Sequence, residues 1–220
     1  MNKINYQKEL EKIVPAAKGK KLLMHSCCAP CSSYCLLYLL PYFKITCFYY
    51  NPNITDEDEY QKRIAELHRL ADTMNDEYGS DIRVIDGEYE PQKFMDAVAA
   101  GDLASCPEGG KRCGMCFGMR LSKTYELARA EGFDYFTTTL TISPLKDAQL
   151  INSIGYNLAD ASKNEGPLWL PSDFKKNDGY KKSIELSRKY DLYRQNYCGC
   201  IMSQRNSQHE EANQTHLGEP

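Results

Sequence analysis

The grouping of cysteines constrains this chain more than any other feature of its sequence. Seven of the ten cysteines fall into three short groups that lie far apart along the 220 residues. The groups are Cys27, Cys28 and Cys31; Cys113 and Cys116; and Cys198 and Cys200. Thiolates that come together from distant segments are how a chain holds zinc or an iron–sulfur cluster. The third group, with one intervening residue, is better suited to cycling between dithiol and disulfide. The pattern predicts a site that combines metal binding with redox chemistry.

Length and composition predict one globular domain over residues 1–205, followed by a polar, disordered tail over residues 206–220. The longest apolar stretch, roughly residues 35–43, contains Pro41 and is far shorter than the ~20 residues that a membrane span needs. The first residues lack the basic-then-apolar pattern of a secretory signal. We therefore expect a cytoplasmic protein with no membrane partner. In that compartment clustered cysteines stay reduced and serve metal binding or catalysis, whereas a secreted disulfide scaffold would oxidise them.

The charges are unevenly distributed along the chain. Residues 55–90 hold twelve acidic and four basic side chains, whereas residues 163–205 hold nine basic and five acidic ones. Between Lys175 and Arg194 the basic residues alternate with tyrosines. This pattern suits RNA, because Lys and Arg contact phosphates and Tyr stacks on splayed bases. The alternative is an amphipathic helix whose tyrosines face the core.

Strand and helix patterns alternate along the sequence. Strands are predicted at residues 21–25, 45–50, 82–85 and 135–142, with a short last strand at 169–170. Helices are predicted at residues 3–18, 32–40, 58–78, 91–100, 118–131, 147–157 and 181–190. The alternation predicts an α/β fold with three layers, in which a parallel sheet carries helices on both faces.

Polar residues directly follow several predicted strands, and the carboxyl ends of parallel strands meet at one edge of the sheet. These residues are Cys27, Cys28 and Cys31 after the first strand, Asn51 and Asn53 after the second, and Ser143 and Asp147 after the fourth. We therefore expect the reactive site at this edge.

Cys113 and Cys116 form a Cys-x-x-Cys motif beside two basic residues, Lys111 and Arg112, which favour thiolate. Inert buried thiols are the alternative to metal binding here. Tetrahedral zinc usually takes two separate knuckles of ligands. The adjacent Cys27 and Cys28 would be strained on one ion but could reach two corners of a cluster or two neighbouring metals. The spacing therefore favours an iron–sulfur cluster over zinc.

Cys198 and Cys200 can form a disulfide only if the chain bends at Gly199. A ring that small is strained, and strained disulfides are easily reduced and suit catalysis. Further metal ligands or inert thiols are the alternatives. Cys35 and Cys47 fit core positions better than a site, and Cys106 fits a loop.

Taken together, the motifs resemble those of the cobalamin-independent epoxyqueuosine reductase family. The matching segments occur in order over roughly residues 20–202, at residues 25–31, 50–54, 108–116, 120–121, 139–144 and 197–200. The resemblance implies an adenine-nucleotide-hydrolase-like (HUP-like) α/β fold with cysteine-rich insertions. It also implies a [4Fe–4S] cluster and the last step of queuosine synthesis, the two-electron removal of the epoxide oxygen of epoxyqueuosine at the tRNA wobble position.

By motif match, the resemblance implies that Cys27, Cys28, Cys113 and Cys116 hold the cluster and that Cys198 and Cys200 are a redox-active catalytic pair. It further implies an additional iron ion beside the cluster. Cys31 is a candidate ligand of that iron, because some family members carry Asp at this position. The implied partners are a tRNA anticodon stem-loop carrying epoxyqueuosine and an unidentified electron donor.

Two other functions compete with the reductase. One is a zinc-stabilised RNA-binding module without catalysis, in which the cysteines have only a structural role. The other is a thiol–disulfide oxidoreductase that needs only Cys198 and Cys200. Iron in the purified protein separates the first from the reductase, and loss of activity without Cys113 and Cys116 separates the second.

Overall fold

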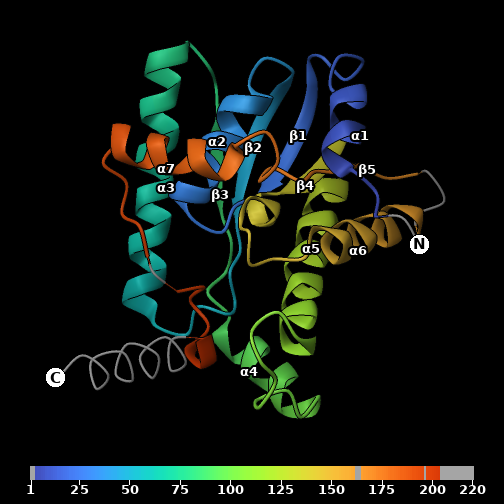
Figure 1. The fold of residues 1–220 in the computed structure, drawn as a ribbon, viewed down its shortest axis with the longest axis vertical. Helices are drawn as coiled ribbons and strands as arrows, with labels where there is room; N and C mark the ends of the chain where they lie inside the picture. The colour runs from blue at the N-terminus through green and yellow to red at the C-terminus, as the bar shows by residue number, and fades with distance from the viewer. Residues whose placement is uncertain (1–2, 162–164, 196, 204–220) are drawn as a thin grey trace, which may run out of the picture.

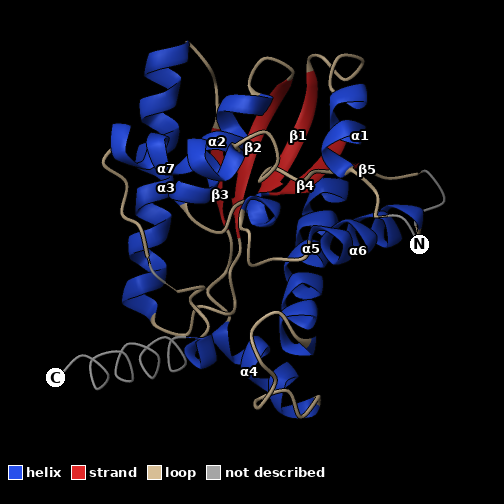
Figure 2. Cartoon of the chain, viewed as in Figure 1, coloured by secondary structure: helices blue, strands red, loops and turns tan. Residues whose placement is uncertain are grey.

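The computed structural model describes residues 3–161, 165–195 and 197–203, and its centre is a five-stranded parallel sheet (Figure 2). The strands are β1 (Lys20–His25), β2 (Phe43–Tyr49), β3 (Arg83–Asp86), β4 (Tyr135–Thr138) and β5 (Leu168–Trp169). Their order in the sheet is β3-β2-β1-β4-β5. This is the order of the doubly wound nucleotide-binding sheets, and it confirms the predicted parallel α/β fold.

Helices cover the sheet on both faces (Figure 1). They are α1 (Tyr6–Ile13), α2 (Ala29–Leu39), α3 (Glu57–Tyr78), α4 (Pro91–Ala100), α5 (Lys111–Ala130), α6 (Ala148–Asp160) and α7 (Gly179–Lys189), with a 3-10 turn, η1, at Thr139–Ile142. Helices α1, α2 and α3 share one core with the sheet, and α7 packs against α2. Helices α5 and α6 share a second core on the opposite face.

The central strand β1 is buried on both faces because successive side chains of a strand point in opposite directions. Leu22 and Met24 belong to the core on the side of α2 and α3, whereas Leu23 belongs to the core on the side of α5 and α6. All three are fully buried. The continuous apolar run of this strand is therefore what a central parallel strand requires.

The connections reverse direction between β1 and β4. The chain passes from β1 to β2 and β3 on one side of β1, and then returns to β4 and β5 on the other. In open parallel sheets the crevice at this reversal, at the carboxyl ends of the strands, is where ligands bind. Residues 26–28, between β1 and α2, and the turn η1 after β4 both lie there.

Two predicted boundaries near this crevice are wrong. The strand predicted at residues 135–142 ends at Thr138, because the Thr138 side chain accepts a hydrogen bond from Leu140 N at 3.1 Å and starts the turn η1. The helix predicted from residue 118 begins at Lys111, with Gly110 as its N-cap after Gly109 at φ 81°. The Cys-x-x-Cys motif therefore lies on the helix and not in a turn before it.

The predicted tail, residues 206–220, lies outside the described residues, and the assignment of residues 1–205 to a single domain stays a prediction. None of the described helices has the length and apolar character needed to cross a membrane.

The contact between α6 and β5 gives a test of the packing. A Cβ atom added at Gly155 would lie 2.2 Å from ring carbons of Trp169. We expect Gly155→Ala to destabilise the protein by about 1–3 kcal/mol, the usual cost of overpacking a core. The matched control is Gly118→Ala on α5, where nothing lies within 4 Å of the added atom. It should stabilise the helix by roughly 0.5–1 kcal/mol. Urea unfolding curves measure both changes, and equal stability of the two variants would contradict this packing.

Candidate metal centre

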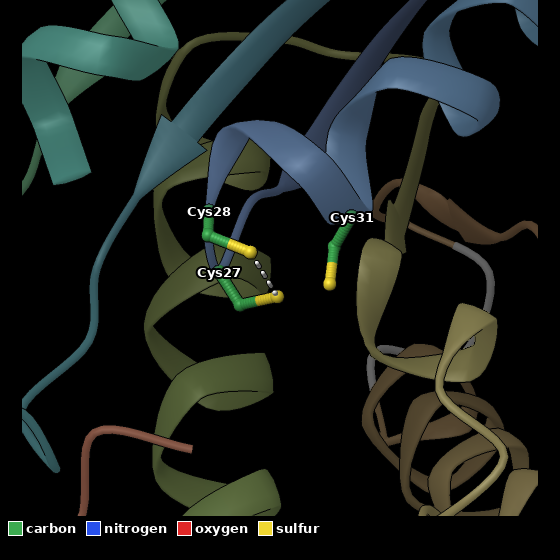
Figure 3. Close-up of side chains that lie close together, drawn as sticks. All are labelled: Cys27, Cys28 and Cys31. Carbon is green, nitrogen blue, oxygen red and sulfur yellow. Dashed lines mark hydrogen bonds between the residues drawn. The ribbon is translucent and has the colours of Figure 1, made fainter. Parts of the chain in front are cut away.

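The first cysteine group lies at the reversal point of the sheet. Cys27 and Cys28 link β1 to α2, and Cys28 is the extended N-cap residue of that helix. Cys31 lies in the first turn of α2, so that its side chain faces the same space (Figure 3). The three sulfur atoms lie within 4.8 Å of one another, and those of Cys27 and Cys28 are 3.9 Å apart. No second group of three or more such ligand residues is found in the described part of the chain.

This spacing of sulfur atoms fits a bound metal ion. A tetrahedral zinc ion with Zn–S bonds of 2.3 Å separates its sulfurs by about 3.8 Å, close to the 3.9 Å between Cys27 and Cys28. The sequence predicts strain for Cys27 and Cys28 on one ion because they are adjacent. The distance between their sulfurs, however, does not exclude that both bind the same ion. The group can bind a metal, and the choice between one ion and a cluster depends on the other cysteines.

The hydrogen bonds within this group favour ionisation of Cys27 over that of the other two cysteines. Hydrogen bonds from Cys28 and Cys31 lower the pKa of Cys27 well below its ordinary value. The Thr139 hydroxyl also donates to its sulfur at 3.4 Å. The hydrogen bond to Cys27 in turn raises the pKa of Cys28 to about 12, and the same interaction raises the pKa of Cys31. A metal ion would displace the protons of these two thiols, because metal ligands must be deprotonated.

The second and third cysteine groups line one cavity of about 190 Å³. Its walls include Cys113, Cys116, Cys198 and Cys200, and also Asn53, Glu108, Lys146 and Asp147. The sulfur of Cys113 accepts a hydrogen bond from Gly109 N at 3.2 Å. Cys116 is buried, and burial raises its pKa to about 12. The structure thus brings together cysteines that are more than eighty residues apart in the sequence.

Lys146 connects this cavity with the first cysteine group. Burial opposes its charge, but the negative charges of Cys198, Cys27 and Cys31 outweigh burial and raise its pKa. One ammonium group therefore lies in the electrostatic field of both the first and the third cysteine groups. The second and third groups share this cavity, and the first group lies at the edge of the sheet that the sequence predicts.

The bend predicted at Gly199 is present. Gly199 has φ 94°, a conformation that favours glycine. A Cβ atom there would lie 2.7 Å from Cγ1 of Ile54 and 3.1 Å from Nη1 of Arg63. Cys198 and Cys200 are both free thiols, and Cys200 is buried. Their redox role is tested by neither observation and stays a prediction.

Asn53 joins the third group to helix α5. Its amide nitrogen donates to the carbonyl of Cys198 at 3.2 Å, and its oxygen accepts from Nη2 of Arg120. Both Asn53 and Arg120 are buried. The sequence indicated that Asn53 lies at this edge, but it gave no role to Arg120. The spacing of Cys113, Cys116 and Arg120, at i, i+3 and i+7 on one helix, was the signal that could have found it.

The surroundings of Arg120 indicate whether a negatively charged metal centre fits this site. Its Nε and Nη1 atoms are buried and have no hydrogen-bond partner among the residues that the structure describes. The charges acting on it come from Cys116, Cys198 and Cys27, and they raise its pKa against the effect of burial. A buried cation requires a nearby anion, so a metal–thiolate centre with net negative charge fits this environment.

Other candidates from the sequence have structural roles. Cys35 and Cys47 are fully buried in the core, as expected, and Cys106 is half-buried in a loop. His25 is buried with both ring nitrogens bonded, Nδ1 to the Thr138 hydroxyl at 2.8 Å and Nε2 to the carbonyl of Tyr50 at 3.1 Å. Burial lowers its pKa to about 3, so the imidazole is neutral.

Asp147 lines the cavity and also caps α6. Its Oδ1 atom accepts a hydrogen bond from Gln149 N at 2.8 Å. One oxygen of this carboxylate is therefore committed to the helix.

The fold and the site define a class of protein, a three-layer α/β protein with a cysteine group that can bind a metal at the carboxyl edge of its sheet. The family model "Epoxyqueuosine reductase QueH" matches residues 22–206 of the sequence. The chain belongs to the epoxyqueuosine reductase QueH family.

Curated relatives with that name cover most of the chain. The protein from Staphylococcus epidermidis is 42% identical over 205 residues, which is 91% of this chain and 85% of the relative. The protein from Streptococcus pyogenes is 41% identical, with 90% of this chain and 78% of the relative covered. The protein from Thermotoga maritima is 32% identical, with coverage of 86% and 94%.

The first cysteine group gives a test of metal binding. Cys28→Ala removes a candidate ligand without removing a helix cap, because the Cys28 side chain makes no capping hydrogen bond. We expect Zn²⁺ to bind at least about tenfold more weakly under anaerobic conditions. Mutation of residues that only hydrogen-bond to metal ligands already lowers metal affinity by about 10–100-fold. The matched control, Cys47→Val, removes a thiol that is fully buried in the core and should bind Zn²⁺ like the parent. Competition with a chromophoric chelator measures both affinities, and unchanged binding by Cys28→Ala would contradict this site.

The bend at Gly199 gives a second test. In Gly199→Ala, contact with Ile54 and strain at φ 94° should displace the segment and expose the thiol of Cys200. We expect Cys200 to be alkylated faster than in the parent protein. Mass analysis of the peptide that contains Cys200 measures the rate. Gly79→Ala is the control, because Gly79 has φ 61° with nothing within 4 Å of an added Cβ atom, so it carries strain without contact. An alkylation rate of Cys200 that is the same in both variants would show that Gly199 does not hold the segment.

Proposed function

We propose that this protein is an oxidoreductase that reduces the epoxide of epoxyqueuosine to give queuosine at the wobble position of tRNA, the last step of queuosine biosynthesis. The observation that carries the proposal is membership of the epoxyqueuosine reductase QueH family over residues 22–206. In this reaction the epoxide takes up two electrons and two protons, both C–O bonds break, an alkene forms and the oxygen leaves as water. The site must therefore provide electrons, protons and stabilisation of the departing oxygen.

For the cofactor, we propose a [4Fe–4S] cluster held by Cys27, Cys28, Cys113 and Cys116. We also propose an additional iron ion beside it, with Cys31 as a ligand. The soft thiolate donors and the buried charge of Arg120 support an anionic iron–sulfur centre. When bound, such a centre supplies electrons one at a time and a Lewis-acidic iron.

The residues of the cavity orient the substrate. A volume of about 190 Å³ is smaller than the roughly 300–1,000 Å³ of sites that enclose a whole drug-sized ligand. The cavity therefore takes the small epoxide-bearing ring, while the rest of the nucleotide stays outside. Lys146 and the carboxylate of Glu108 both line it. We propose that the Lys146 ammonium donates a hydrogen bond to an oxygen of the ring, since Lys146 lines the cavity.

For Cys198 and Cys200 we propose a role as the dithiol of the catalytic cycle. Oxidation of two thiols to one disulfide releases two electrons and two protons, which matches the demand of one epoxide. The bend at Gly199 and the common cavity with Cys113 and Cys116 support this role. An external electron donor, which is not identified, would then reduce the disulfide.

The proposed partner is the anticodon stem-loop of tRNA carrying epoxyqueuosine, and we place the reaction in the cytoplasm. The basic segment around α7 offers one surface for RNA, since Lys181 and Lys182 are exposed. The guanidinium of Arg194 lies 5.6 Å from the ring of the exposed Tyr180. Tyr190 in the same segment is buried in the core, so this tyrosine is structural.

The competing functions give different outcomes. A zinc-stabilised RNA-binding module would be colourless after anaerobic purification and would leave epoxyqueuosine unchanged. A thiol–disulfide oxidoreductase would keep its activity without Cys113 and Cys116. A brown protein that absorbs near ~400 nm supports the iron–sulfur cofactor.

Mass analysis of tRNA nucleosides tests the reaction. After anaerobic incubation with the protein and an artificial reductant, we expect epoxyqueuosine to lose one oxygen atom and become queuosine. Cys28→Ala should lose the activity, and Cys47→Val should retain it. Epoxyqueuosine that persists beside an intact cluster would refute the proposed reaction.

The same assay tests the dithiol. The double variant Cys198→Ser, Cys200→Ser should lose turnover, because the substituted hydroxyl groups cannot form a disulfide. Normal turnover of this variant with the artificial reductant would remove the pair from the cycle and leave the reductase function intact.

A further inference from the structure

We propose that Arg120 is a hydrogen-bond donor and a fixed positive charge to the sulfur atoms of the bound iron–sulfur centre, and that it raises the reduction potential of that centre. The proposal deepens the function proposed above and rests on its cofactor. It concerns a residue on α5 that has no thiol and is not a metal ligand.

The helix places Arg120 next to the cysteines. Cys113, Cys116 and Arg120 stand at i, i+3 and i+7 of α5, which puts the three side chains on one face. Cys113 and Cys116 line the cavity on that face, and so does Asn53, which accepts a hydrogen bond from Arg120. Arg120 is only 1% exposed. Its guanidinium group is therefore held against the inner wall of the cysteine site, away from solvent.

The hydrogen bonds of Arg120 are incomplete. A guanidinium has five N–H donors and no acceptor. Among the described residues only Nη2 has a partner, the oxygen of Asn53, while Nε and Nη1 have none. Within that same part of the chain Arg120 forms no ion pair with a carboxylate. Leaving buried donors unpaired costs about 1–3 kcal/mol for each group, and more for a charged one.

The two other buried arginines are better paired than Arg120, although Nη2 of Arg63 also has no hydrogen-bond partner among the described residues. Nε of Arg63 is paired with Oε1 of Glu59 at 2.7 Å, so its charge is balanced within α3. Nη1 of Arg112 donates to the backbone carbonyls of Leu103, Ala104 and Cys106. Arg112 thereby anchors the loop that precedes α5. Arg120 differs from Arg63 in having no carboxylate partner, and from Arg112 in having two buried donors without an acceptor, among the described residues.

The groups around Arg120 show what that acceptor is. The groups whose ionised forms favour the charge of Arg120 are Cys116, Cys198 and Cys27, followed by Tyr49. Cys116 and Cys27 are ligands of the proposed centre, and Cys198 belongs to the dithiol that shares the cavity with Cys116. The cations that share this region are Lys146, on the loop after η1, and Arg63, whose charge Glu59 balances. The sulfur atoms of the centre are therefore the acceptors that fit the free donors.

A donor in this position has a defined electronic effect. The reduction potential of an iron–sulfur cluster is set by its net charge, by hydrogen bonds to its sulfurs and by its exposure to solvent. Reduction adds one negative charge to the centre, and a buried positive charge stabilises the reduced form more than the oxidised form. Removal of the charge and its donors must lower the potential, which makes the centre harder to reduce.

Potentiometric titration of the holoprotein under anaerobic conditions, monitored by EPR, tests the proposal. We expect Arg120→Gln, which loses the charge, to shift the potential to a more negative value. Arg120→Lys, which keeps the charge but loses the fork of donors, should give a smaller shift. The control is Arg129→Gln, at the exposed end of the same helix, which should keep the reduction potential of the parent protein. An Arg120→Gln protein that keeps its iron content and the parental potential would overturn the proposal.

A measurement on the parent protein avoids dependence on the folding of variants. With nitrogen-15-labelled arginine, pulsed EPR of the reduced centre should show a nitrogen-15 coupling from a guanidinium bonded to sulfur. Absence of this coupling in a protein with an intact centre would overturn the role of Arg120 even if queuosine is formed. A parent protein that holds no reducible iron–sulfur centre would instead refute the proposed cofactor, and the inference with it.

Discussion

Burial of several thiols at one point of the fold is the constraint on which the rest of this site depends. Thiols in an apolar environment keep their protons, and burial accordingly raises the pKa of Cys47 and of Cys116. Ionised thiols there require opposite charge and hydrogen-bond donors close by. The protein provides them from separate elements, with Arg120 on α5, Lys146 after η1 and the hydroxyl of Thr139 on η1. If the sulfurs are anionic, each of these residues supplies a positive charge or a hydrogen-bond donor that stabilises them.

The topology explains why these residues can meet. The first cysteine group lies at the point where the sheet reverses direction, between β1 and β4. A hydrogen bond from Cys27 N to Oγ1 of Thr139, at 3.3 Å, joins the two strand ends directly. Asn53, which follows β2, links Arg120 to the carbonyl of Cys198. The crevice at the edge of a doubly wound sheet usually holds a nucleotide or another ligand, and here cysteines fill it.

Much of this could be predicted from the sequence, because local patterns determine the elements. The apolar run of β1 and the periodicity of α3 gave their positions within one residue. The carboxyl-edge rule placed Cys27 and Asn53 correctly, although they belong to different strands. The strand after Tyr135 was predicted too long, since its β-branched residues Thr139 and Thr141 favour a strand whereas the capping hydrogen bond of Thr138 ends it. Arg120 was missed because the helix was predicted to begin at residue 118, so that its i, i+7 relation to Cys113 on one helix was not recognised.

We propose that cysteines from distant segments bind one iron–sulfur centre at the edge of the sheet. Anomalous diffraction at the iron edge, from crystals grown without oxygen, tests it most directly. We expect a single cluster of iron peaks bounded by Cys27 and Cys28 on one side and by Cys113 and Cys116 on the other. Iron bound by only one of these pairs, with the other pair remote from it, would contradict the account.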